Sequence, residues 1–346
     1  MPTVALDLLG GDGAPDVVAD AAASLLREQE PISLILVGPE EQARELLAAR
    51  GLTEGRLAGG DPAGGPLSGG PLSGGCIALA HASRAVRMDE DPLRALREDA
   101  DASVSVASRL VAKGSADAWV SVGHTGAAVA AAVLELGRIP GMSRPALAVV
   151  VPGVAGRVVL LDAGAAPDAT PDLLRQFAVV GHAYAEGLGA VDPAVGLLTI
   201  GSEDGKGDLL RRSAHELLRD SLIAAGIRYA GPVEGHDVAL GERAQVIVTD
   251  GFTGNVVLKA LEGAVQWAAV RMGAAYGDIG PARGVVRETA TSEFAGGMLL
   301  GVQGVTVIGH GAGSAEEIAA CVRLAARAAD AGLARRTSEA LAGGRS

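Results

Sequence analysis

The sequence predicts an α/β fold: a three-layer, mostly parallel sheet with helices on both faces. Short apolar runs rich in Val, Leu and Ile alternate with segments of helical spacing, which is typical of βα units. Several runs are apolar almost without interruption, as expected for strands that are covered on both faces. Most are followed by a glycine-rich turn and then a helix. We expect strands at 3–7, 32–38, 116–123, 157–162, 194–201, 245–250 and 305–310.

The chain of 346 residues has the length of a large α/β enzyme or of two lobes. We predict a single two-lobed catalytic domain over residues 1–335. Residues 59–75 contain PLSGG twice in tandem, and we interpret them as a flexible insertion. Residues 336–346 are expected to form a flexible tail.

Composition limits the classes of function. A net charge of −12 and an aromatic content of 2% argue against nucleic-acid binding. Cys76 and Cys321 lie in no metal-ligand spacing, so we interpret both as buried small apolar residues. No apolar stretch is long enough to span a bilayer, and no basic segment followed by an apolar stretch opens the sequence. We therefore expect a cytoplasmic protein.

The turn TDGFTGN, which ends at Asn255, has the composition of an anion site. Gly251 and Gly254 allow positive φ angles and close approach of the backbone. We predict that Asn255 is the N-cap of the following helix, whose N-terminus attracts phosphate. Thr253 adds a hydroxyl donor. The alternative is a capped turn in which Asp250 accepts nearby N–H groups, and this segment alone does not decide between them.

Two other turns carry titratable side chains. His124 lies in the strand-to-helix turn GHTG, where an imidazole can donate to an oxyanion or cap the helix. Lys206 lies in GSEDGKG beside Glu203 and Asp204, either at a site or as a solvated lysine. In open α/β sheets ligands bind beyond the carboxyl ends of the strands, where all these turns fall.

A metal site is the alternative to a phosphate site at this edge. Its ligands would be Asp7, Asp12, Asp162 and Asp250, which lie at or just past strand ends. Their spacing is not specific for a metal, so we favour phosphate and expect no cofactor. The sequence has no G-x-S-x-G, no GxxxxGK[ST] and no G-x-G-x-x-G motif, which disfavours serine hydrolases, P-loop NTPases and Rossmann dehydrogenases.

As a set, the motifs resemble those of the bacterial acyl-ACP:phosphate acyltransferases, the PlsX family. The resemblance spans roughly residues 3–260 and returns more weakly at 308–314. TDGFTGNVVLK and GRIPGMSRPA are its specific parts. The motifs, in chain order, are LDLLGGDGAP, DEDPLRALR, SVGHTGA, GRIPGMSRPALA, LLDAGA, GSEDGKG and VTDGFTGNVVLK.

This resemblance implies an acyltransferase that moves a fatty acyl group from acyl carrier protein to inorganic phosphate. The acyl phosphate product would feed phospholipid synthesis. It also implies a fold like that of isocitrate and isopropylmalate dehydrogenases, and a homodimer. The family's Lys-rich C-terminal helices are replaced at 268–297 by a shorter, glycine-broken segment, so we expect at most peripheral membrane contact.

The catalytic candidates are His124, Lys206 and Asn255. We expect the 251–255 turn to hold phosphate with Lys206, while His124 or Lys206 polarises the thioester carbonyl. The candidate substrate-binding residues are Asp7, Gly10, Gly11, Asp12, Thr125, Gly126, Asp162, Gly164, Glu203, Asp250, Gly251, Thr253, Gly254 and Lys259.

Four positions depart from the family pattern. Gly13 and Ala166 stand where the family has His and Asn, and His124 and His236 stand where it has Asn and Arg. These changes leave three alternatives open. They are an acyltransferase that uses another thioester donor, a non-catalytic protein that binds acyl or phosphate ligands, and a metal- and nicotinamide-dependent dehydrogenase of the same fold.

Overall fold

The computed structural model describes residues 1–53, 55, 76–203, 205–280, 282–284, 286 and 296–343. The insertion predicted at 59–75 and Asp204 lie outside these residues. The chain divides into two compact units, each made of two segments. Unit 1 comprises Met1–Gly137 and Val302–Gly332, and unit 2 comprises Arg138–Gly301 and Leu333–Ser346.

Unit 1 is built on parallel strands in the order β3-β2-β1-β4-β11. Every residue of β2 and β4 is buried, which explains their continuous apolar sequence. Trp119 in β4 is fully buried. The strands are β1 (Thr3–Asp7), β2 (Ser33–Gly38), β3 (Ile77–His81), β4 (Ala118–Ser121) and β11 (Val305–Gly309).

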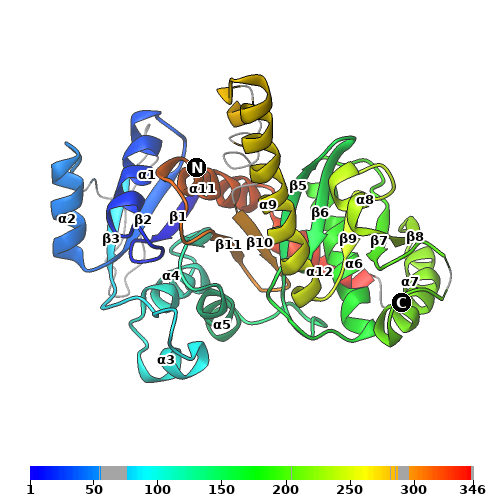
Figure 1. Ribbon diagram of the computed structural model, residues 1–346. Coiled ribbons are helices and arrows are strands. Elements are labelled where there is room, and N and C mark those ends of the chain that lie inside the picture. The colour runs from blue at the N-terminus through cyan, green and yellow to red at the C-terminus, as the bar shows by residue number, and fades with distance from the viewer. Residues whose placement is uncertain are drawn as a thin grey trace. The chain divides into compact units, whose positions relative to one another are not determined.

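Helices cover both faces of these strands (Figure 1). The α1–α11 pair packs against one face, and α4 with α5 packs against the other. The apolar face of α11 is rich in alanine, and its first turn has a capping box formed by Ser314 and Glu317. The helices of unit 1 are α1 (Asp16–Arg27), α2 (Glu40–Ala49), α3 (Pro92–Glu98), α4 (Ser103–Ala112), α5 (Thr125–Glu135) and α11 (Ala315–Asp330).

Unit 2 has strands in the order β10-β5-β6-β9-β7-β8. The β10–β5 and β5–β6 pairs are antiparallel, whereas β6, β9, β7 and β8 are mutually parallel. The predicted mostly parallel α/β class is therefore confirmed. The strands are β5 (Ala146–Gly153), β6 (Gly156–Leu161), β7 (Val195–Leu198), β8 (Tyr229–Val233), β9 (Val246–Val248) and β10 (Gly296–Leu300).

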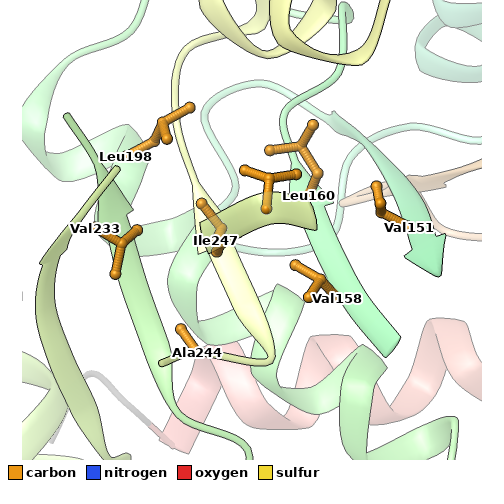
Figure 2. Packing of buried hydrophobic residues seen from close by; sticks show 8 residues of the cluster. Val151, Val158, Leu160, Leu198, Val233, Ala244 and Ile247 are labelled. Carbon is orange, nitrogen blue, oxygen red and sulfur yellow. The ribbon is translucent and has the colours of Figure 1, made fainter. Parts of the chain in front are cut away.

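A cluster of buried apolar side chains, mostly Val, Leu and Ile, packs on one face of the strands of unit 2 (Figure 2). Leu160 and Ile247 are fully buried at its centre, and Val238 of α8 (Gly235–Leu240) joins them. Burying such a side chain contributes about 1.5–3 kcal/mol. Leu258 and Leu261 of α9 (Gly251–Tyr276) pack against the same cluster and hold the first half of that helix in place.

The other face is covered by α6 (Pro171–Gly187), with α7 (Leu209–Ala224) and α12 (Leu333–Gly343) beside it. Gly181 lets α6 lie close to the strands, since a Cβ there would be 2.9 Å from Val246 Cγ1. The flexible tail expected at 336–346 is wrong for its described part. Leu333, Thr337 and Leu341 are buried, because their i, i+4, i+8 spacing places them on the face of α12 that packs on α6. The Thr337 hydroxyl donates to the Leu333 carbonyl at 3.0 Å.

The start of α9 also differs from the prediction. The N-cap is Asp250, not Asn255, so the glycines of the turn lie inside the helix. The helix has 26 residues, and its buried residues are Gly251, Gly254 and Ala269. Its second half extends beyond the strands of unit 2 (Figure 1). Apolar side chains on this half, such as Trp267, are exposed. Among the described helices, none combines the length and apolar character needed to cross a bilayer.

Candidate active site

In unit 1, three strand-to-helix turns meet beyond β1, β4 and β11. A Cβ at Gly10 would lie 2.8 Å from the Gly123 nitrogen, so these two turns touch through their backbones. Gly11 has φ +96°, and a Cβ there would lie 2.9 Å from the Gly311 carbonyl oxygen. The Asp12 N–H donates to the same oxygen at 2.7 Å. The glycines that suggested a site therefore allow three turns to pack together.

Asp7 lies beneath these turns and is 1% exposed. Its Oδ2 accepts the Ser121 hydroxyl at 2.7 Å, and its Oδ1 accepts the Leu9 N–H at 3.1 Å. Burial raises the pKa of the Asp7 carboxyl, and the hydrogen bond from Ser121 opposes that change. The Gly123 N–H donates to the Ser121 hydroxyl at 3.1 Å, so Asp7 supports the β4 turn from below.

His124 is the N-cap of α5, and its ring is half-buried. Its Nδ1 accepts the Gly126 N–H at 3.1 Å. A neutral imidazole that accepts at Nδ1 carries its proton on Nε2 and can donate from there. The capping role considered from the sequence is thus confirmed, and it leaves one donor on the ring. Thr125 begins the helix, and a Cβ at Gly126 would lie 3.3 Å from Pro92 Cγ of α3.

In unit 2, the turn after β6 is organised by Asp162, which is fully buried. Its carboxylate accepts N–H groups from Leu147 at 2.8 Å, Gly164 at 3.0 Å, Ala165 at 2.9 Å and Ala166 at 2.6 Å. Burial raises the pKa of Asp162, and these N–H groups oppose that increase. With four donors already bound, Asp162 shapes the turn and leaves little capacity to bind a ligand.

The first turn of α9 lies directly against Asp162. A Cβ at Gly254 would overlap the Asp162 carbonyl oxygen, and one at Gly251 would be 2.7 Å from Asp162 Oδ2. Asn255 lies on the exposed side, where its Nδ2 donates to the Ala163 carbonyl at 3.1 Å. The same amide lies 3.1 Å from the position of a Cβ at Gly164, which has φ +136°.

Three N–H groups expected to hold phosphate are already bonded within the protein. The Gly251 N–H donates to the Ala166 carbonyl at 2.8 Å, and the Thr253 N–H donates to Asp250 Oδ1 at 2.9 Å. The Gly254 N–H donates to the Asp250 carbonyl at 3.0 Å. An anion can use them only if these bonds exchange. The capped turn, the alternative left open by the sequence, is the arrangement observed.

Asp250 has a cationic partner that the sequence analysis missed. Arg211 Nη2 donates to Asp250 Oδ2, and it lies 3.0 Å from the Thr253 hydroxyl, which itself donates to Asp250 at 2.8 Å. Burial raises the pKa of Asp250, but the hydrogen bonds from Thr253 and the charge of Arg211 outweigh it and hold the pKa below its ordinary value. One local signal was available: a cation in the first turn of a helix opposes the helix dipole and favours a nearby carboxylate, but this signal does not identify Asp250.

The remaining predicted residues of unit 2 are more exposed. Lys206 and Glu203 lie in one turn, where the Lys206 N–H donates to the Glu203 carbonyl at 3.2 Å, and both residues are exposed. Lys259 lies about two helical turns into α9 and donates to Glu262 at 2.9 Å. Lys259 therefore lies away from the cap.

The metal alternative finds no support among the residues that the structure describes. No group of three or more His, Cys, Asp or Glu side chains there could hold a metal ion. Of the four aspartates considered, Asp12 is exposed, Asp7 accepts Ser121, Asp162 accepts four N–H groups and Asp250 pairs with Arg211.

Two of the departures from the family pattern have clear surroundings. Ala166 is buried and contributes only backbone atoms, through its N–H to Asp162 and its carbonyl to Gly251. His236 lies at the start of α8 with its side chain 63% exposed, 3.9 Å from Glu234.

The fold and its turns define the class of the protein: an α/β protein with polar, glycine-rich turns at the carboxyl ends of parallel strands. The sequence matches the family described as "Fatty acid synthesis protein" over residues 71–336, and the chain belongs to that family. The predicted PlsX membership is confirmed.

Relatives and solved structures agree with this assignment. The chain is 40% identical to a phosphate acyltransferase of Thermus thermophilus over 350 residues, covering 98% of each chain. It is 40% identical to that of Thermobifida fusca over 93% of this chain and 86% of the relative. A phosphotransacetylase structure from Streptococcus pyogenes superposes with a TM-score of 0.60 at 20% identity, covering 95% and 94% of the two chains. A 4-hydroxythreonine-4-phosphate dehydrogenase from Klebsiella pneumoniae gives 0.56 at 14% identity, covering 95% and 100%. At these identities the structures support the predicted dehydrogenase-like fold alone.

Proposed function

We propose that this protein transfers an acyl group from a thioester, with acyl carrier protein as the carrier, to inorganic phosphate. A phosphate oxygen attacks the carbonyl carbon, a C–O bond forms, the C–S bond breaks, and the carrier thiolate leaves and takes up a proton. The observation that supports this most is the 40% identity, over 98% of both chains, to a protein named phosphate acyltransferase.

His124 is the group we assign to the carbonyl oxygen. Negative charge develops on that oxygen as phosphate attacks, and a donor already fixed in place stabilises it without reorganisation. The cap to the Gly126 N–H orients the ring and directs its remaining proton to Nε2. The buried Asp7–Ser121 pair holds the backbone of the same turn.

Lys206 and Asn255 are the groups we assign to phosphate. Lys206 supplies the positive charge from an exposed position in its turn. Asn255 is exposed at the first turn of α9 and retains its carbonyl oxygen and a second amide hydrogen beside the bond to Ala163. We keep Gly251, Thr253 and Gly254 as the residues that position this turn, because their N–H groups already bind Ala166 and Asp250.

We also propose that the protein acts as a homodimer that places α9 in its interface, in the cytoplasm. Trp267, Val270 and Tyr276 of this helix are 67%, 63% and 79% exposed. Large apolar side chains gathered on one exposed helix mark an interaction site more often than they face water. Light scattering should give twice the chain mass for the wild type and a smaller mass for Trp267→Glu; a monomeric wild type would contradict the dimer.

The activity is tested with purified protein, long-chain acyl carrier protein and phosphate. Hydroxylamine converts an acyl phosphate to a hydroxamate, which mass spectrometry detects. We expect a hydroxamate that requires phosphate and grows with time, and that is much reduced in Lys206→Ala and His124→Ala. Lys113→Ala, at an exposed lysine that forms the C-cap of α4 and is assigned no role in binding or catalysis, is the matched control and should keep its rate.

The alternatives predict different results. An enzyme with another donor gives product from acyl-CoA but not from acyl carrier protein. A binding protein binds phosphate or acyl chains and gives no product with any donor. Reduction of NAD with a hydroxy acid, abolished by EDTA, would indicate the dehydrogenase. No product from an active donor, with a working relative assayed alongside, would refute the proposed acyl transfer.

A further inference from the structure

Two helices of unit 2 begin in the same way beside each other at the strand ends. Asp208 caps α7, with Oδ1 accepting the Arg211 N–H at 2.8 Å. Asp250 caps α9, with Oδ1 accepting the Thr253 N–H at 2.9 Å. In each cap Oδ1 accepts a backbone N–H of its own helix, and Oδ2 remains for other partners, which at Asp250 include the Thr253 hydroxyl at 2.8 Å.

One guanidinium binds both remaining oxygens. Arg211 Nη1 donates to Asp208 Oδ2 at 2.9 Å, and Nη2 donates to Asp250 Oδ2. Nη2 also lies 3.1 Å from the Thr249 hydroxyl, at the carboxyl end of β9. A planar fork with nitrogens on two edges can make these contacts at once, whereas the single nitrogen of a lysine cannot.

This arrangement is shielded from solvent on the α9 side. The Arg211 and Asp250 side chains are 12% and 8% exposed, whereas Asp208 is 58% exposed. An ion pair with so little access to water is weakly screened, and removing one member leaves the other charge buried. One cation between two carboxylates leaves a net charge of −1, so the cluster does not itself attract phosphate.

The two capped turns are those that carry the groups assigned to phosphate. Lys206 precedes Asp208 by two residues, and Asn255 lies in the first turn of the helix capped by Asp250. The link is tight on the α7 side, since a Cβ at Gly207 would lie 2.8 Å from Arg211 Cβ and 2.6 Å from the Thr199 hydroxyl oxygen. Displacing one cap relative to the other would change the separation of Lys206 and Asn255.

We propose that Arg211 is a positioning residue that locks the Lys206 turn to the Asn255 turn, so that both groups reach one phosphate. This inference rests on the proposed function. It assigns Arg211 an effect on phosphate binding and none on the acyl donor. Misplacing reacting groups by about 1 Å can cost up to about 100-fold, so a change of this size is measurable.

The test compares the phosphate and acyl-donor KM values of Arg211→Lys with those of the wild type. We expect the phosphate KM to rise about tenfold, with the acyl-donor KM within about twofold, since only the phosphate groups are displaced. Arg219→Lys is the matched control on the same helix, because Arg219 is 54% exposed and pairs with its neighbour Asp220. It should match the wild type in both constants.

A double-mutant cycle separates positioning from general weakening of the fold. Asp208→Asn weakens only the α7 side of the fork and should raise the phosphate KM. If both changes act through one link, the pair of Asp208→Asn and Arg211→Lys should bind phosphate no worse than Arg211→Lys alone. Equal changes in both KM values, or a lower melting temperature with unchanged kinetic constants, would overturn the proposal and leave Arg211 a structural residue.

Phosphate titration followed by NMR gives a readout that does not depend on turnover. If the wild type binds phosphate but forms no product, acyl transfer fails while Arg211 is still tested, through an expected tenfold weaker binding in Arg211→Lys (about 1.4 kcal/mol). If phosphate binds equally well to both proteins, or does not bind to the wild type, the positioning role is refuted.

Discussion

Replacing His124 separates its two roles, capping α5 and donating from Nε2. His124→Ala removes the acceptor of the Gly126 N–H, a hydrogen bond of 3.1 Å. Loss of an N-cap costs about 1 kcal/mol, which for a unit of this size lowers the melting temperature by roughly 2–4 °C. Loss of the Nε2 donor removes one group from the developing oxyanion, which lowers kcat by about 100-fold or more.

His124→Asn restores one of these roles fully. Its side-chain oxygen can accept the same N–H, so we expect the melting temperature of the wild type. Its amide offers a donor from a shorter side chain, so we expect kcat to lie between those of the alanine variant and the wild type. Calorimetry and the hydroxamate assay measure the two effects, and His236→Ala, at an exposed imidazole of unit 2, is the control.

The two variants can refute the reasoning separately. If His124→Ala has a lower melting temperature but an unchanged kcat, His124 is a cap and not a catalytic residue. If His124→Asn is as unstable as His124→Ala, the observed hydrogen bond contributes nothing and the tautomer argument fails with it.

Three further predictions follow from burial. Burial raises the folded-state pKa of Asp7 above its ordinary 3.8, so just above pH 3.8 the folded state binds more protons than the unfolded state. The free energy of unfolding should therefore fall as the pH rises through this interval. Urea midpoints measured across it should fall for the wild type and should not show this fall for Asp7→Asn. Burial raises the pKa of Cys321 to about 12. A thiol reagent should therefore label Cys76, which is only half-buried, and leave Cys321 unlabelled until the protein unfolds. Equal labelling rates for the two cysteines would contradict this. Gly254→Ala places a Cβ against the Asp162 carbonyl oxygen and should lower the free energy of unfolding by at least about 2 kcal/mol. Gly263→Ala, in open space on the same helix, should raise it by about 0.5–1 kcal/mol, and similar values for both variants would refute the close approach.

Strands such as β2 and β4 could be predicted because their sequence expresses a local requirement, continuous apolar side chains on both faces. Among the described strands, β3, β5, β8 and β10 were not predicted. The start of α9 could not be predicted, since Asp250 and Asn255 are both good caps and glycine disfavours helix interiors. Only the approach of Asp162 to Gly254 requires glycine there, and those residues are far apart in the sequence. A long-range contact overrode the local preference.

The same distinction applies to the candidate site. His124 could be found because a titratable side chain followed a strand. Arg211 was missed because its role depends on Asp250, 39 residues further along the chain, and no local pattern joins them. The buried part of α12 was missed because the arginines and glycines around Leu341 resemble those of a tail, and only packing against α6 selects its apolar stripe.

The long α9 helix is held mainly by contacts at its N-terminal end, and this determines where it unfolds locally. Its first turns are fastened by Asp250, Asn255 and the cluster around Ile247, whereas its last turns hold a single buried side chain, Ala269. Amide hydrogens should therefore exchange in a gradient, slowly near Gly254 and rapidly towards Tyr276, because local unfolding costs little where few contacts are lost. If a second molecule of the protein covers those turns, exchange there should slow as the protein concentration rises. The exchange rates along α9 would then report the fraction of the protein that is dimeric.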